Sequence, residues 1–209
     1  MELDHVLFAV SDLDAAAREL EARHGLSSVE GGRHAGWGTA NRIVPLGDAY
    51  IELITVVHPA EAEASAFGRW VAGGLQAEPS QPLGWVARTE EIDDVAGRLG
   101  LDVSPGSRAG RDGRILSWRL AGVDQAAAEP SLPFFVEWGA GTPLPGRTPV
   151  SHPAGPVRLT RLELSGDRAR VSAWLGAVSL PLTVYEGEPA VTAVALEADS
   201  GEVILGAGQ

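Results

Sequence analysis

The feature of this 209-residue chain that most limits its fold is a supersecondary unit that returns along the sequence. The apolar stretch LDHVLFAV, residues 3–10, is typical of a strand, and Asp12 can cap the helix that follows and ends at His24-Gly25. A glycine-rich segment and strand patterns at 40–46 and 49–57 come next. The pattern therefore predicts a βαβββ unit at the start of the chain.

The same order of elements recurs in the second and third parts of the chain. Residues 83–89 predict a strand, and a helix with one apolar face then ends at Gly100 before further strand patterns. Because Leu3 and Leu83 begin equivalent strands, the period is about 80 residues, which is too long for a solenoid and suits duplication of a half-domain. The predicted modules are 1–58, 83–138 and a degenerate third at 157–209, with connectors at 59–82 and 139–156.

Charge and composition exclude several classes of function. A net charge of −12 repels nucleic acid and anionic lipid, so we expect neither as a partner. The chain has no cysteine, which leaves His, Asp and Glu as the side chains that can hold a metal. No apolar run approaches the ~20 residues of a membrane span, and no signal peptide is evident. We therefore expect a cytoplasmic protein that acts on a small molecule.

Several motifs place the chain near a known family. They are His34, Gly38-Thr39-Ala40-Asn41 and Tyr50-Ile51-Glu52-Leu53 in the first module, and Arg108, Asp112-Gly113 and Leu116-Ser117-Trp118-Arg119-Leu120 in the second. With the duplicated βαβββ unit, these motifs resemble the glyoxalase-like domain family of the vicinal oxygen chelate superfamily. The resemblance implies an α+β fold in which paired βαβββ modules form a curved, cup-like mixed sheet with helices outside. It also allows a homodimer.

The resemblance further implies a divalent metal ion in the cup, with ligands from the first and last strands of each module. Those places hold His5, Glu52, Trp85 and Glu137. Trp85 cannot bind a metal, so the implied ligands are His5, Glu52 and Glu137. Such a set suits Zn²⁺, Ni²⁺, Mn²⁺, Fe²⁺ or Mg²⁺ and leaves positions for water or substrate. The implied role of the metal is that of a Lewis acid that stabilises an enediolate.

The residues themselves also single out two carboxylates, independently of any family. Glu52 and Glu137 each interrupt an apolar or aromatic strand, and a buried carboxylate is costly unless it is paired, hydrogen-bonded or metal-bound. One interpretation is catalysis, with Glu137 or Glu52 as the proton-transfer base. The structural alternatives are exposure on one face of the sheet, or an ion pair with Arg42, Arg88 or Arg119.

The sequence is compatible with two functions. The first is a metal-dependent lyase or isomerase that acts on a small oxygenated metabolite. The second is a metal-free protein that binds or sequesters a small molecule, such as an antibiotic, in an aromatic-walled cup. Both make contact with the ligand through the same candidate side chains, which are His34, Trp37, Asn41, Trp85 and Trp118. Core packing is the structural alternative for each tryptophan.

Overall fold

The computed structural model describes residues 1–75, 82–109 and 115–206. Its elements are β1 (Glu2–Ala9), α1 (Leu13–His24), β2 (Val29–His34), β3 (Thr39–Pro45), β4 (Tyr50–Val56), α2 (Pro59–Ala64), α3 (Ala66–Gly74), β5 (Gly84–Arg88), α4 (Ile92–Leu99), β6 (Val103–Ala109), β7 (Ile115–Ala121), α5 (Val123–Ala128), β8 (Phe134–Trp138), a 3₁₀ turn at Pro145–Arg147, β9 (Val157–Ser165), α6 (Arg168–Leu175), β10 (Leu182–Tyr185), β11 (Ala190–Ala198) and β12 (Gly201–Gly206). In the described ranges, no helix has both the length and the apolar character that crossing a membrane would need.

The local signals at helix α1 are where the sequence predicts them. Asp12 accepts hydrogen bonds from the backbone N–H groups of Asp14 and Ala15, which would otherwise lack partners. Gly25 ends the helix at φ 65°, in the left-handed region that glycine adopts without a steric penalty. The short alanine-rich helix α5, which lies between β7 and β8 of the second module, was not predicted.

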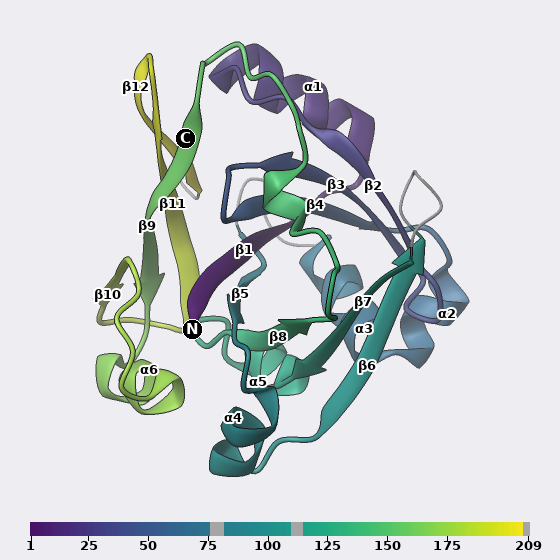
Figure 1. Ribbon diagram of the computed structural model, residues 1–209, viewed down its shortest axis with the longest axis vertical. Helices are drawn as coiled ribbons and strands as arrows, with labels where there is room; N and C mark the ends of the chain where they lie inside the picture. Colours follow the sequence, from purple (N-terminus) through teal and green to yellow (C-terminus); the bar gives the residue numbers. More distant parts are fainter. Residues whose placement is uncertain (76–81, 110–114, 207–209) are drawn as a thin grey trace.

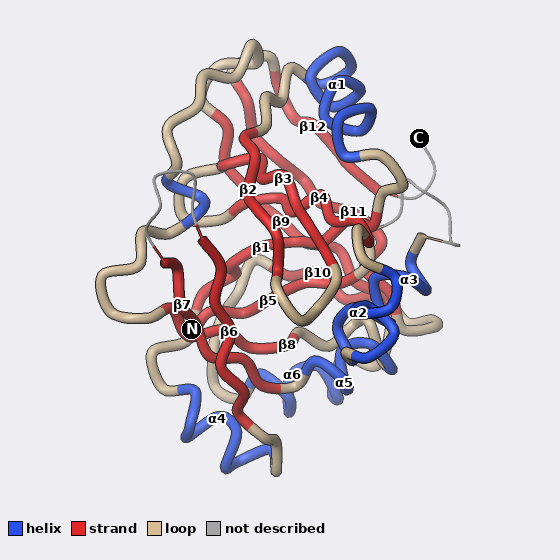
Figure 2. The backbone as a smooth tube through the Cα atoms, turned by 90° about the vertical axis from the view of Figure 1, so that its right-hand side faces the viewer, coloured by secondary structure: helices blue, strands red, loops and turns tan. Residues whose placement is uncertain are grey.

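An eight-stranded mixed sheet in the order β2-β3-β4-β1-β5-β8-β7-β6 forms the body of the fold. Strands β1 and β5 pair antiparallel at its centre and join the two modules. The end strands β2 and β6 contact each other, so the sheet curves almost into a closed ring (Figure 1). Helices lie around the strands (Figure 2), and α3 packs against apolar residues of the concave face. The predicted α+β fold with a curved, cup-like sheet is therefore confirmed.

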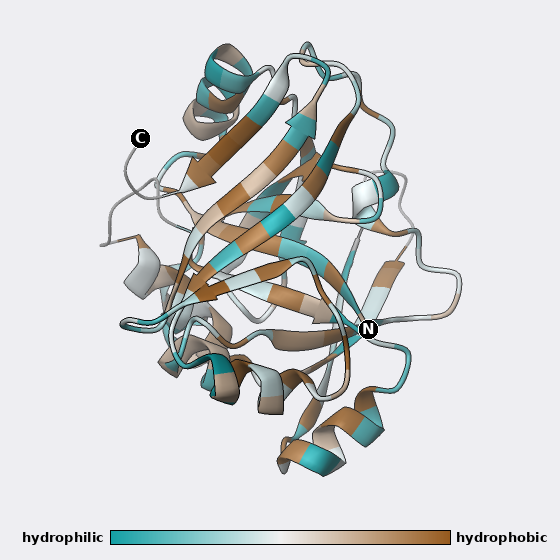
Figure 3. Cartoon of the chain, turned by 90° about the vertical axis from the view of Figure 1, so that its left-hand side faces the viewer, coloured by the Kyte–Doolittle hydropathy of each residue, from teal (hydrophilic) through white to brown (hydrophobic). Residues whose placement is uncertain are grey.

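The C-terminal part forms a second, four-stranded sheet in the order β10-β9-β11-β12. It has the βαβββ order of elements, but the helix connects β9 to β10, which pair side by side and parallel. In the first module, by contrast, the first strand pairs parallel with the last one. Apolar and polar residues alternate along these strands (Figure 3), as expected when one face of a sheet is covered. The third module thus repeats the element order with a different strand pairing.

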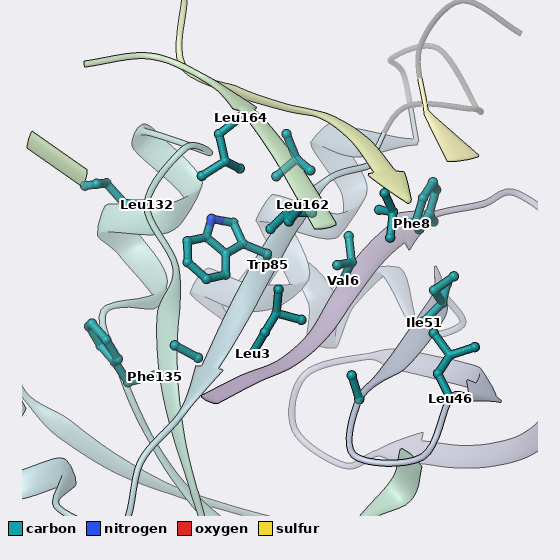
Figure 4. Close-up of a cluster of buried hydrophobic side chains, with 14 of the residues drawn as sticks. Leu3, Val6, Phe8, Leu46, Ile51, Trp85, Leu132, Phe135, Leu162 and Leu164 are labelled. Carbon is teal, nitrogen blue, oxygen red and sulfur yellow. The ribbon is translucent and has the colours of Figure 1, made fainter. Parts of the chain in front are cut away.

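The main hydrophobic core lies between the two sheets. Leu162 and Leu164 of β9 belong to the same buried cluster as Val6 of β1 and Trp85 of β5. The indole of Trp85 is fully buried, lies toward Leu162 and Leu164 (Figure 4), and donates from Nε1 to the carbonyl oxygen of Ser131 at 3.0 Å. A separate apolar cluster fills part of the concave face. The outer face of β1 and β5 is therefore covered by the second sheet.

Candidate functional site

A pocket opens on the concave face of the eight-stranded sheet. Its lining comes from both modules. The lining residues are His5, His34, Trp37, Asn41, Tyr50, Glu52, Phe67, Arg108, Trp118, Leu120, Phe134, Val136 and Trp138. Six predicted site residues, namely His5, His34, Trp37, Asn41, Glu52 and Trp118, are brought together here.

An imidazole and a carboxylate face each other on the pocket floor. Nε2 of His5 on β1 lies 3.3 Å from Oε2 of Glu52 on the adjacent β4, and both side chains are 6% exposed. The amide of Asn41, on β3, donates from Nδ2 to the other carboxylate oxygen at 2.5 Å. The ring of Tyr50 stacks on the imidazole with centroids 4.3 Å apart. These contacts restrict His5 and Glu52 to a single arrangement.

A second carboxylate, Asp4, holds the other side of the His5 ring. Strand β1 has an irregularity between Leu3 and His5, where Asp4 is the extra residue relative to β5. Asp4 is 1% exposed, and its Oδ1 lies 2.7 Å from Nδ1 of His5. Its Oδ2 accepts from Trp138 Nε1 at 3.0 Å and from Arg88 Nη1 at 3.3 Å. Asp4 therefore orients the imidazole from behind.

The electrostatic environment separates the two histidines. Burial alone would lower the pKa of His5, but the hydrogen bonds and charges of Asp4 and Glu52 outweigh it and raise this pKa to about 9. Burial would raise the pKa of Glu52, but the hydrogen bond and charge of His5 lower it to about 2. Burial lowers the pKa of His34 to about 4. At neutral pH the pocket thus holds a His5 cation, a Glu52 anion and a neutral His34.

Because the pKa of His5 is raised, we expect the stability of the protein to decrease as the pH becomes alkaline. Folding favours the protonated ring, so this contribution is complete below the ordinary pKa of 6.5 and disappears as the pH rises through about 9. We expect the melting temperature of the wild type to fall between these pH values and that of His5→Gln to fall much less. Thermal unfolding of both proteins across the range checks this, and parallel curves would contradict it.

Aromatic rings form the walls around these polar groups. The ring of His34 on β2 lies 5.5 Å from Trp37 and 6.2 Å from Trp118, between centroids. Its Nδ1 lies 2.9 Å from Oγ1 of Thr39, and its Nε2 lies 4.0 Å from Oε1 of Glu52. Phe67 of α3 packs against Trp37 at 5.0 Å. The neutral imidazole is therefore a polar group within a mostly aromatic wall.

Two predicted site residues, Trp85 and Glu137, face away from the pocket, which corrects the sequence-based expectation. Trp85 pairs with Val6 and lies on the outer face, whereas Val86 is the residue that pairs with His5. Glu137 shares the outer face with Phe135, pairs with Arg119 through Nη2 at 2.5 Å, and accepts from the backbone N–H of Ile92. Glu137 therefore forms an ion pair with Arg119, which was the alternative to a catalytic or metal-binding role. Trp85 packs in the core.

One residue of offset explains both errors. Side chains alternate between the faces of a strand, so matching two strands one residue out of step exchanges their faces. The extra residue Asp4 in β1 produces such a step between His5 and Trp85, whereas Glu137 lies one residue beyond the position on β8 that corresponds to Glu52. His5 pairs with Tyr50 in the first module, and Val86 pairs with Phe134 in the second. Two residues after Tyr50 on β4 the inward position holds Glu52, and two residues after Phe134 on β8 it holds Val136. Sequence motifs that look equivalent therefore point to opposite faces.

The residues present do not fit the metal centre that the resemblance implies. In the second module Val86 and Val136, which have no donor atoms, occupy the inward positions that correspond to His5 and Glu52. Throughout residues 1–75, 82–109 and 115–206, no group of three or more His, Asp or Glu side chains is arranged to hold a metal ion. We therefore assign no chemical step to a metal.

Sequence reasoning missed Asp4 as a site residue, although a signal was available. Asp4 interrupts an apolar strand in the same way as Glu52, and the cost of burying a carboxylate applies equally to it. Arg108, which belongs to the motif of the second module, lies in the pocket wall. The neighbouring Asp112-Gly113 pair of that motif lies outside the described residues.

Comparisons with known proteins agree with this architecture. The model of a family described as "Glyoxalase-like domain" matches residues 3–178. The crystal structure of a hypothetical protein from Staphylococcus aureus is 14% identical, with a TM-score of 0.69 over 94% of this chain and 91% of that one. This similarity shows the fold, and it extends into the C-terminal sheet. A comparison with curated proteins gave no match.

Two further structures are similar over part of the chain. Methylmalonyl-CoA epimerase from Mycobacterium tuberculosis is 21% identical over 66% of this chain and 86% of its own, with a TM-score of 0.45. A Streptomyces coelicolor epimerase variant in complex with 2-nitronate-propionyl-CoA is 20% identical over 68% of this chain and 98% of its own, with a TM-score of 0.47. Similarity at this level carries no argument about the ligand of this chain.

Proposed function

We propose a function on one premise: this chain belongs to the glyoxalase-like domain family, within the vicinal oxygen chelate superfamily. In this proposal the concave pocket binds a small oxygenated metabolite, and His5 and Glu52 move a proton on it in an isomerase- or lyase-type reaction. The observation that carries the proposal is the 3.3 Å contact between His5 Nε2 and Glu52 Oε2 on the floor of a buried, aromatic-walled pocket.

The two groups suit the enolisation of a carbonyl compound that bears a hydroxyl on the next carbon. Glu52 accepts the C–H proton of the carbon that bears the hydroxyl. The electron pair of that C–H bond forms the C=C bond of an enediol. His5 donates its Nε2 proton to the carbonyl oxygen, which takes up the π electrons of the C=O bond. Glu52 then gives its proton to the neighbouring carbon, and the original hydroxyl returns its proton to His5 as its oxygen becomes the new carbonyl oxygen, so protons and electrons balance.

Coupling between the groups supports this division of roles. The hydrogen bond and charge of His5 are what hold the pKa of Glu52 low against the effect of burial. As His5 transfers its proton to the substrate oxygen, that influence weakens and the pKa of Glu52 rises toward the value that burial favours. Glu52 thus becomes a stronger base at the stage at which a proton must be taken from carbon.

The test compares two isosteric variants, Glu52→Gln and Glu137→Gln. The probes are hydroxyacetone and hydroxypyruvate in D₂O, with proton NMR to follow exchange at the carbon that bears the hydroxyl. We expect exchange above the buffer rate for the wild type, a decrease of about 100-fold or more in Glu52→Gln, and no decrease in Glu137→Gln. Glu137 is the matched control because it lies on the outer face of the sheet.

Three results would overturn the proposal. Equal exchange in wild type and Glu52→Gln would remove Glu52 as the base. Loss of exchange on treatment with EDTA would show that a metal is required. Exchange at the buffer rate with both probes would favour the second function, a metal-free binding protein, which the aromatic rings of Trp37, Phe67 and Trp118 also suit.

A further inference from the structure

An arginine in the pocket wall has few partners for its charge. Arg108 of β6 is 8% exposed, and its Nη1 donates to the carbonyl oxygen of Gly31 on β2. A guanidinium has five N–H donors, and this bond to Gly31 is the one that Arg108 makes among the described residues. Within the described part of the chain, no carboxylate lies within ion-pair distance of Arg108. Arg108 is thus a buried cation that faces the ligand space.

The other charges around the pocket are matched within the protein. Asp4 is bonded to Arg88 and to the His5 ring, and Glu52 lies against the opposite edge of that ring. Burying a charge is costly unless a partner of opposite sign compensates it. Arg108 therefore favours a ligand with a negative charge, even though the protein as a whole has a net charge of −12.

Asn41, which also lines the pocket, presents an acceptor without a donor. Its Nδ2 donates to Glu52, and this bond fixes the orientation of the amide, because a flipped amide would set two oxygens against each other. In the described residues, its buried Oδ1 has no hydrogen-bond partner. An unmatched buried acceptor favours a ligand that supplies a donor.

Gly31 lies between these two groups. Its carbonyl oxygen accepts the bond from Arg108, and a Cβ at position 31 would come within 2.0 Å of Asn41 Oδ1. The absence of a side chain at position 31 therefore lets the amide of Asn41 lie close against β2. A site for an anion and a site for a hydroxyl donor are consequently adjacent, and Glu52 follows directly beyond Asn41.

We propose that the pocket recognises 2-hydroxycarboxylates, with the carboxylate paired to Arg108 and the 2-hydroxyl donating to Asn41 Oδ1. This inference deepens the proposed function, because it names the substrate class of the same site. A hydroxyl on the carbon next to the carboxylate matches two adjacent sites. The remainder of such a ligand then extends toward Glu52 and His5, where the proposed proton transfer takes place.

Three probes of similar size separate the two contacts without mutation. Lactate has both groups, lactamide lacks the charge and propionate lacks the hydroxyl. The fluorescence of the pocket tryptophans Trp37, Trp118 and Trp138 reports binding. We expect lactate to bind about tenfold or more tightly than either of the others, since each comparison removes a hydrogen bond to a buried group.

Two variants assign each preference to its residue. Arg108→Gln is expected to lose the preference for lactate over lactamide and to keep the preference for lactate over propionate. Asn41→Ala is expected to lose the preference for lactate over propionate and to keep the preference for lactate over lactamide. Arg108→Lys should restore part of the charge preference, because it keeps the charge and loses the planar fork. Thermal unfolding shows whether each variant is folded, and the wild-type comparison stands even if one is not.

The outcomes separate this inference from the proposed function. Lactate has no ketone to enolise, so its binding does not depend on proton transfer. The lactate preference without any exchange of hydroxypyruvate in D₂O would support the ligand class and overturn the catalytic role. Equal binding of lactate and lactamide would overturn the role of Arg108, and equal binding of lactate and propionate would overturn that of Asn41, whatever the exchange experiment shows.

Discussion

Replacing Trp85 with alanine is expected to lower the free energy of unfolding by about 3–5 kcal/mol, the usual cost of removing a fully buried large aromatic ring. The ring is 0% exposed and lies between the two sheets, against Leu162 and Leu164. A cavity there would weaken the contact between β5 and the C-terminal sheet. The variant would also leave the carbonyl oxygen of Ser131 without its donor. Urea denaturation monitored by circular dichroism measures the change.

Trp37→Ala is the matched control for this prediction. Trp37 is a tryptophan of the pocket wall that is only partly buried, so we expect a loss of less than half that of Trp85→Ala. For ligand binding we expect the reverse order: Trp37→Ala should weaken binding more than Trp85→Ala, since Trp37 lines the pocket and Trp85 does not. A loss below about 1 kcal/mol in Trp85→Ala would mean that the second sheet does not cover this face as described.

Asp4→Ala is expected to lower the free energy of unfolding by about 3–5 kcal/mol, as when one partner of a buried ion pair is removed. Asp4 accepts from Arg88 and Trp138 and lies 2.7 Å from His5 Nδ1, so its loss removes an acceptor from three side chains. Burial then lowers the pKa of His5 with only Glu52 to oppose it. Urea denaturation gives the stability, and an NMR titration of His5 gives the pKa.

The matched control is Glu2→Gln, because Glu2 pairs with the same Arg88 from an exposed position. Its side chain is 66% exposed, against 1% for Asp4. An exposed ion pair contributes about 0–1 kcal/mol, so we expect little change in stability and none in the titration of His5. If both variants lost the same amount, the burial of Asp4 would not be the cause of its effect.

The parts of the fold that depend on local patterns could be predicted from the sequence. Asp12 and Gly25 delimit α1 by capping, and repeated strand patterns indicate duplicated modules. The buried carboxylate Glu52 stands out in an apolar strand for the same local reason. Strand pairing in the C-terminal sheet could not be predicted this way, since the same βαβββ order permits more than one order of strands.

The candidate site shows where local information ends. His5, His34, Trp37, Asn41, Glu52 and Trp118 were singled out from motifs, and they line one pocket. For Glu137 and Trp85 the sequence determined only that a carboxylate and a tryptophan occur in buried strands. The tertiary structure decided the face, because a single residue of register reverses the side on which a side chain lies, and for Trp85 the extra residue Asp4 in β1 sets that register. It also decided that Arg108 reaches Gly31, since the strands that carry them meet only when the sheet curves almost into a ring.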